Sequence, residues 1–133
     1  ANEIFRREGK MIKLWDCYRP LSVQQKMWKF LPNPVYVADP NGYGSVHNRG
    51  GAVDITLVDK NGTELDMGTK FDYFGSRAFP DYKNLPDTVL ANRELLISTM
   101  KSLGFRNSRS EWWHFSHPKA YHYQVSDFQI PCY

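Results

Sequence analysis

The chain is organised around one stretch, Gly44-Ser45-Val46-His47-Asn48-Arg49-Gly50-Gly51-Ala52-Val53-Asp54. His47 and Asp54 are residue types that bind zinc, and the Gly50-Gly51 pair between them permits a sharp change of direction. From Ala52 to Val58, residues alternate in the pattern of a strand. One turn and the strand that follows it can therefore offer two ligands to the same metal ion.

A second stretch, Glu111-Trp112-Trp113-His114, supplies another imidazole and another carboxylate. Catalytic zinc takes about three protein ligands and keeps one position open for water, and His47, Asp54 and His114 are the right types for such a set. Glu111 would then remain free to act as a general base. On a flat strand the side chains of Glu111 and His114 would point in opposite directions, so we expect a bend just before Glu111.

Taken singly, these residues have more ordinary interpretations. A lone histidine is usually packed or surface-exposed, and His117 and His122 are assigned to that ordinary role. Asp54 alone could cap a turn, and Glu111 alone could be a surface charge. The two strings together, in this order, are much harder to explain by chance.

Composition limits the other classes of function. The chain has 133 residues, enough for one domain with a real core, and its 41% hydrophobic and 23% charged residues are ordinary for a globular protein. The formal charge of +3 comes without a basic run, so we expect no nucleic-acid partner. No apolar run reaches the ~18–20 residues of a membrane-spanning helix. The sequence does not decide whether Cys17 and Cys132 form a disulfide.

Helical and strand patterns are mixed along the chain, which predicts an α+β fold with an antiparallel sheet. Two helix starts carry cap signals: Ser22 with Gln25 as a capping box, and Thr88 as an N-cap. Asn61-Gly62 predicts a hairpin turn. The predicted helices are 1–7, 22–31 and 88–103; the predicted strands are 11–18, 52–58, 63–65, one near 105 and 112–115; 66–85 is a long ordered loop, and 121–130 is a strand or irregular chain.

The two metal-ligand strings resemble those of a known family. Ser45 to Asp54 matches the Ser-x-His-x-x-Gly-x-Ala-x-Asp motif of the zinc D-Ala-D-Ala metallopeptidases, and Glu111 to His114 matches their Glu-x-x-His motif. Within that superfamily the chain most resembles the D-alanyl-D-alanine dipeptidases of the vancomycin-resistance type. Support comes from the runs Trp15 to Pro20, Asp66 to Asp72 and Glu111 to Phe115, and the resemblance covers nearly everything from Met11 on.

This resemblance implies a Hedgehog/DD-peptidase fold, in which a central antiparallel sheet is flanked by helices. It also implies one zinc ion held by His47, Asp54 and His114, with Glu111 acting first as base and then as acid. Arg19, in the Tyr-Arg-Pro motif, resembles the arginine that steadies the oxyanion. A fixed guanidinium at developing negative charge can be worth a few kcal/mol. Without the resemblance, a structural ion pair at a strand end would explain Arg19 equally well.

A free D,D-dipeptide, the small-molecule partner that the resemblance implies, carries an ammonium and a carboxylate close to the scissile bond. Asp72 is the candidate for the ammonium, although it could simply cap a loop. Ser45 is the candidate for a substrate polar group near the metal, although it could bond within its own turn. Four aromatic residues could wall a small pocket or pack in the core: Tyr43, Tyr73, Phe74 and Trp113.

Residues 1–133 are interpreted as a single zinc-peptidase domain. Family members usually carry a longer N-terminal section, so we expect a missing N-terminal segment, on the same or another chain. Two alternatives stay open: a D,D- or L,D-carboxypeptidase acting on peptidoglycan peptides, and a non-catalytic zinc-stabilised binding domain, against which Glu111 argues. Few cysteines and no visible export signal favour the cytoplasm. The role in antibiotic resistance, cell-wall recycling or nutrition stays open.

Overall fold

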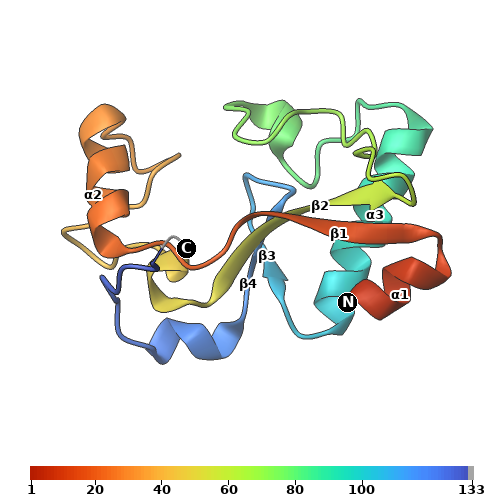
Figure 1. The fold of residues 1–133 in the computed structure, drawn as a ribbon. Helices are drawn as coiled ribbons and strands as arrows, with labels where there is room; N and C mark the ends of the chain where they lie inside the picture. Colours follow the sequence, from red (N-terminus) through yellow and green to blue (C-terminus); the bar gives the residue numbers. More distant parts are fainter. Residues whose placement is uncertain (132–133) are drawn as a thin grey trace.

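The computed structural model describes residues 1–131, which form a four-stranded antiparallel sheet with three α-helices (Figure 1). This confirms the α+β class that the sequence predicted. The strands are β1 (Lys10–Asp16), β2 (Ala52–Asp59), β3 (Arg106–Asn107) and β4 (His114–Ser116); the helices are α1 (Asn2–Arg7), α2 (Leu21–Phe30) and α3 (Asp87–Ser102); and the 3₁₀ turns are η1 (Val46–Arg49), η2 (Ser76–Ala78) and η3 (Pro118–His122).

The strands lie in the order β1-β2-β4-β3, so β2 is paired along both edges. Ile55 and Leu57 are buried in the core, and Asp54 and Thr56 are buried as well, because elements cover both faces of this central strand. The β1–β2 register shifts between Leu14 and Asp16. A bulge of this kind bends a strand and re-aims its side chains.

The core lies between the sheet, α1 and α3, which pack near one end of the molecule, while α2 stands at the opposite end (Figure 1). The aromatic residues of this core come from α1, from the two residues just before β4, and from β4 itself. The buried cluster consists of Phe5, Ile55, Leu57, Met67, Ala78, Leu96, Ile97, Met100, Trp112, Trp113 and Phe115. Apolar residues of the predicted strand 52–58 and of the predicted helix 88–103 therefore pack in the same core.

Both predicted N-caps are wrong. Helix α2 begins at Leu21 after Pro20, α3 begins at Asp87 after Pro86, and neither has a side-chain cap hydrogen bond from its N-cap residue. The fixed φ of proline suits the entry to a helix without any local cap. In α2, Asp127 from the far end of the chain accepts the Ser22 backbone N–H at 2.7 Å instead.

Three other predictions are corrected in detail. The hairpin turn at Asn61-Gly62 forms, but its return strand shrinks to a single bridge between Val58 and Glu64, because the Asp59 side chain binds the N–H groups of the turn. Trp112 and Trp113 form a turn, and β4 starts only at His114. After Pro118 the chain makes η3 and then runs irregularly, so of the two alternatives for 121–130 the strand is wrong and the irregular chain is confirmed beyond η3.

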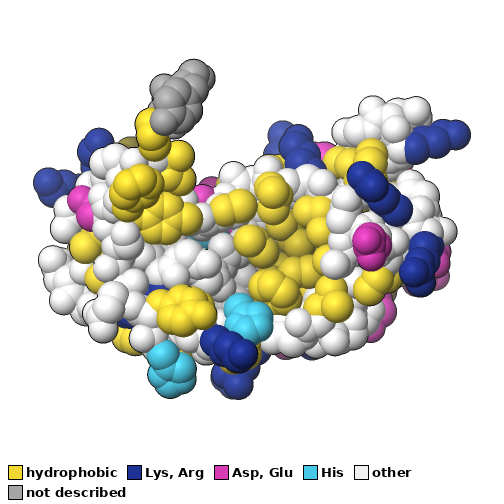
Figure 2. Space-filling model, turned by 60° about the horizontal axis from the view of Figure 1, so that its bottom comes forward, with side chains coloured by type: hydrophobic (Ala, Val, Ile, Leu, Met, Phe, Trp, Pro, Cys, Tyr) yellow, Lys and Arg dark blue, Asp and Glu magenta, His cyan; other side chains and the backbone are white. Residues whose placement is uncertain are grey.

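Cys17 is exposed, and Cys132, whose pairing with it the sequence left open, lies outside the described residues. Within residues 1–131, no helix combines the length and the hydrophobicity that crossing a bilayer requires. On the face at the bottom of Figure 1, hydrophobic side chains gather near the middle (Figure 2). The described Lys and Arg side chains of that face are scattered and form no continuous patch.

Candidate metal centre

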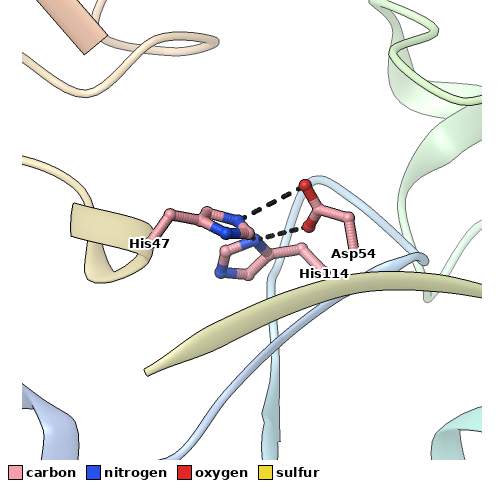
Figure 3. Close-up of side chains that lie close together, drawn as sticks. All are labelled: His47, Asp54 and His114. Carbon is pink, nitrogen blue, oxygen red and sulfur yellow. Dashed lines mark hydrogen bonds and ion pairs between the residues drawn. The ribbon is translucent and has the colours of Figure 1, made fainter. Parts of the chain in front are cut away.

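Three side chains converge where η1, β2 and β4 meet (Figure 3). His47 Nε2 lies 3.1 Å from His114 Nδ1 and 3.3 Å from Asp54 Oδ2, and His114 Nδ1 lies 3.0 Å from Asp54 Oδ1. Asp54 and His114 are direct partners in the β2–β4 register. Backbone pairing therefore places two of the three donors, and the turn before β2 supplies the third.

The turn that carries His47 is built by its own sequence. Ser45 Oγ accepts the His47 backbone N–H at 3.2 Å, and the Asn48 side chain accepts the Ser45 N–H at 2.9 Å, which is a capping box. Gly50 ends the turn with φ +63, a left-handed conformation that glycine adopts without strain. A Cβ on Gly51 would lie 1.9 Å from the Ala120 Cβ. The glycine pair thus serves a turn and a close approach.

Hydrogen bonds to the candidate ligands fix their orientation and their charge. The Cys17 carbonyl accepts a hydrogen bond from His47 Nδ1 at 2.6 Å, so Nε2 is the nitrogen that faces the centre and would bind a metal. Burial alone would raise the pKa of Asp54, but hydrogen bonds from His114 and His47, and their charges, lower it to about 2. The carboxylate is therefore ionised and ready to bind a cation.

The donor set fits a divalent metal ion. Ligand atoms at about 2.0–2.1 Å from a tetrahedral zinc lie roughly 3.3 Å apart, close to the separations between the two imidazole nitrogens and from each nitrogen to an Asp54 carboxylate oxygen. Two imidazole nitrogens and one carboxylate oxygen also match the ligand chemistry of catalytic zinc. Among the described residues, no fourth His, Cys, Asp or Glu joins the group, so a position is left for water or substrate.

A cavity of about 260 Å³ opens onto this group. Its lining includes all seven residues to which the sequence analysis assigned a metal, catalytic or substrate role: Arg19, Ser45, His47, Asp54, Asp72, Glu111 and His114. Of the four aromatic residues considered as pocket walls, only Trp113 lines this cavity. A larger cavity, of about 720 Å³, lies beside Trp15, Phe71 and Trp112 and includes none of the seven. The smaller cavity is therefore the candidate site.

Glu111 lies beside the metal group, which consists of His47, Asp54 and His114, but is not part of it. Its Oε2 is 4.0 Å from His114 Nδ1, and the chain bends between the two residues, where the His114 N–H donates to the Glu111 carbonyl at 3.4 Å. The Asn107 amide holds this bend by donating to the carbonyls of Glu111, Trp112 and His114. The bend expected just before Glu111 is also present, at Arg109 and Ser110. Burial, with the charges of Asp54 and Asp72, raises the pKa of Glu111.

Hydrogen bonds hold both the backbone and the guanidinium of Arg19. Its backbone N–H donates to the His47 carbonyl at 3.1 Å, and the Asn48 amide donates to its carbonyl at 2.8 Å. Its guanidinium binds Asp16 and Gln24. Asp16, Gln24 and Asn48 are not among the site residues predicted from the sequence. Asp16 and Asn48 lie within the quoted runs Trp15 to Pro20 and Ser45 to Asp54, whereas Gln24 lies in neither.

Asp72 is the only non-glycine residue with positive φ, 55°, in residues 1–131. Such strain is uncommon and often accompanies functional positions. Burial, with the negative charge of Asp54, raises the pKa of its carboxyl group. Ser45 also lines the cavity, but its Oγ lone pair is engaged by the His47 N–H, the local role that was its ordinary interpretation. The Ser45 hydroxyl proton is still free to be donated.

Comparison with known proteins identifies the family. A family model described as "D-ala-D-ala dipeptidase" matches residues 1–131. A D-alanyl-D-alanine dipeptidase of Escherichia coli is 38% identical over 130 residues, which are 98% of this chain and 67% of that protein. Proteins of the same name from Enterococcus faecalis and Streptomyces coelicolor are 33% and 36% identical, with 80% and 85% of this chain and 62% and 67% of theirs covered.

The chain spans roughly two thirds of the length of these relatives. The match nevertheless runs through both strings of candidate metal ligands and through the whole sheet. The chain therefore belongs to the D-Ala-D-Ala dipeptidase family of peptidases.

Proposed function

We propose that this chain is the catalytic domain of a zinc-dependent dipeptidase that hydrolyses D-Ala-D-Ala to two molecules of D-Ala. The observation that carries the proposal is the position of Glu111. This carboxylate lines the same cavity as His47, Asp54 and His114 but stands outside the group of donors. A purely structural zinc site fills all four positions with protein ligands and needs no neighbouring base.

His47, Asp54 and His114 would hold the metal. Bound zinc supplies Lewis acidity: it lowers the pKa of water toward ~7 and polarises a carbonyl group. The donors favour zinc because calcium and magnesium prefer sets made of oxygen atoms alone. The buried Asp54 carboxylate balances part of the charge of the cation, and the Cys17 carbonyl keeps the His47 ring in the required tautomer.

Glu111 carries the proton. Its carboxylate takes a proton from the attacking water and delivers it to the nitrogen of the leaving D-Ala, so the same group acts as base and then as acid. A carboxylate with a raised pKa is a better proton acceptor than an ordinary one, and burial in the cavity supplies that shift.

Arg19 and Asp72 would receive the charges of the substrate. The guanidinium of Arg19 stabilises the oxygen on which negative charge develops during attack. The carboxylate of Asp72 binds the free ammonium group of the dipeptide, and the Ser45 hydroxyl donates to a substrate oxygen near the metal. Arg19, Asp72 and Ser45 all line the one cavity, whose volume of about 260 Å³ suits a small ligand.

The first test is the release of D-Ala by the zinc-loaded chain from D-Ala-D-Ala, with L-Ala-L-Ala and N-acetyl-D-Ala-D-Ala alongside. We expect cleavage of the free D,D-dipeptide alone. Cleavage of the acetylated peptide instead would make the chain a carboxypeptidase, the alternative with the same metal group. Zinc binding without hydrolysis of any of the three would leave a binding domain.

The mechanism is tested by Glu111→Ala. We expect the variant to bind zinc as the wild type does and to lose at least ~10²-fold in kcat, because proton transfer contributes about that much. Glu64→Ala is the matched control, since Glu64 is exposed and pairs only with Lys13. Full activity in Glu111→Ala would remove this residue from the mechanism.

A further inference from the structure

We propose that Gln24 is a positioning residue: its side-chain amide holds the Arg19 guanidinium in the orientation that the reaction requires. This inference rests on the proposed function, in which Arg19 meets the developing negative charge. Gln24 also lines the cavity, but both polar atoms of its side chain are bonded to the protein, so it acts on the substrate through Arg19.

Gln24 occupies an unusual place for a glutamine. It is the only buried residue of α2 and has 0% exposure, whereas its neighbour Val23 is 38% exposed. Burying an amide costs free energy unless its polar atoms are bonded. Here both ends are bonded: Oε1 accepts from Arg19 Nη1 at 2.8 Å, and Nε2 donates to the Ala38 carbonyl at 2.8 Å.

These two contacts fix the direction of the amide. The Ala38 carbonyl accepts only, so the NH₂ group must face it, and Oε1 must then face the guanidinium. Ala38 belongs to the loop after α2 that lines the cavity together with Pro34, Val35 and Tyr36. Gln24 therefore ties Arg19 to one wall of the cavity.

The hydrogen-bond inventory of Arg19 shows what this arrangement leaves free. A guanidinium has five N–H donors. Asp16 Oδ2 accepts from Nε and Nη2, and Gln24 accepts from Nη1. Within residues 1–131, one N–H on each terminal nitrogen is left without a protein acceptor, and Arg19 lines the cavity. Two donors on one rigid plane are thus available to substrate oxygens.

The two acceptors contribute differently. Asp16 binds one edge of the guanidinium but also offsets its charge. Gln24 binds the remaining terminal nitrogen and is neutral, so it removes rotational freedom without lowering the positive charge that faces the cavity. A carboxylate at position 24 would reduce that charge. With Gln24 lost, the guanidinium keeps its contact with Asp16 but can swing about it.

The central experiment is a double-mutant cycle on the zinc-loaded chain with D-Ala-D-Ala. Gln24→Met keeps the length of the side chain and removes both hydrogen bonds. We expect kcat to fall about 10- to 100-fold, since small misplacements of catalytic groups have effects of this size, with zinc content unchanged. In an Arg19→Ala background the same substitution should change kcat less than about twofold, because the group that it positions is gone.

Gln25→Met is the matched control, because Gln25 is the neighbouring glutamine of the same helix and is exposed. It should leave kcat unchanged. Gln24→Asn is the second variant: it folds with a polar side chain but is too short to reach both partners, so the same loss is expected. Equal losses from Gln24→Met with and without Arg19 would overturn the proposal.

A readout independent of activity separates this inference from the proposed function. In ¹⁵N NMR spectra, the Arg19 Nη–H signals should be resolved and slowly exchanging in the wild type and in Gln25→Met. They should average in Gln24→Met. Unchanged signals would refute positioning by Gln24 even in an active enzyme. An inactive wild type with the expected NMR pattern would instead refute the proposed function and leave the positioning role standing.

Discussion

Two sides of the cavity are built by different means. The side that carries the metal group is held by backbone pairing, since Asp54 and His114 are register partners and the His47 turn is bonded to the backbone of Arg19. The opposite side is the loop before α3, which contains Asp72. It has no regular strand, and its anchors include one backbone hydrogen bond, from the Trp112 N–H to the Ala78 carbonyl, and several from the side chain of one arginine.

The main support of that loop is Arg93. This arginine is 2% exposed and donates to three carbonyls, those of Met67, Arg77 and Phe79, at 2.7 to 3.1 Å. Burial lowers its pKa to about 10, so it is still charged at neutral pH. The candidate metal ligands are thus held by the sheet, and the loop that carries Asp72 depends on a single buried arginine.

The largest effect is expected on the metal side. Asp54→Asn keeps the size of the side chain and removes its charge, and we expect zinc affinity to fall by at least ~10²-fold, more than for loss of an outer-shell partner. The sheet should persist because the Asp54–His114 pairing is made by the backbone. Zinc titration with a circular dichroism spectrum measures both. Asp59→Asn, at the far end of β2, is the control, and equal zinc affinity in the two variants would contradict the ligand role.

The next effect is expected on the loop side. Arg93→Met leaves three carbonyls without their donor and should lower the free energy of unfolding by roughly 2–4 kcal/mol. Zinc affinity should change less than about threefold, because the metal side does not depend on Arg93. Urea denaturation and zinc titration give the two numbers. Arg109→Met is the control, since Arg109 is exposed; a similar loss of stability there would remove the special role of Arg93.

A smaller effect is expected where the loop meets the wall after α2. Tyr36 and Phe74 lie with ring centroids 4.5 Å apart, are 37% and 54% exposed, and join the two loops. Phe74→Ala should cost less than about 1 kcal/mol of stability. It should raise cleavage of N-acetyl-D-Ala-D-Ala relative to the free dipeptide by about threefold to tenfold, because an acyl group beside Asp72 gains room.

Tyr73→Ala is the control for that change, since Tyr73 is the adjacent exposed aromatic residue and takes no part in the ring pair. Parallel assays of the two peptides with both variants measure the ratio. An unchanged ratio in Phe74→Ala would mean that the ring pair does not restrict the substrate.

The smallest effect concerns the contact between the chain end and α2. Hydrogen bonds from Ser22 lower the pKa of Asp127 below its ordinary value of 3.8. The stabilisation is therefore present above the unfolded pKa of ~3.9 and is lost as pH falls through the lower folded pKa. The protection factor of the Ser22 amide in hydrogen exchange should fall over that range. In Asp127→Asn this dependence should vanish, and its persistence would assign it to another group.

The metal group could be predicted because its signals are local. The alternating residues after Gly51 indicated strand β2, and the Gly50-Gly51 pair indicated the turn before it. Glu111 and His114 belong to one short motif, three residues apart. The two predicted helix caps were wrong for different reasons. In α2 the Ser22 N–H is bound by Asp127, which is distant in sequence. In α3 the N-cap position is occupied by Pro86, whose fixed φ suits the start of a helix, and not by Thr88. Gln24 gave no sign of its role, since a glutamine in a helix is usually exposed.

The sequence by itself determined the fold class, the turn and strand that carry His47 and Asp54, and the residue types that can bind a metal, because periodicity and glycine conformations act over a few residues. Only the tertiary structure decided the orientation of Arg19 by Gln24, the anchoring of the loop by Arg93 and the gathering of all candidates on one cavity. Those features depend on hydrogen bonds between residues brought together by packing, and no local pattern encodes them.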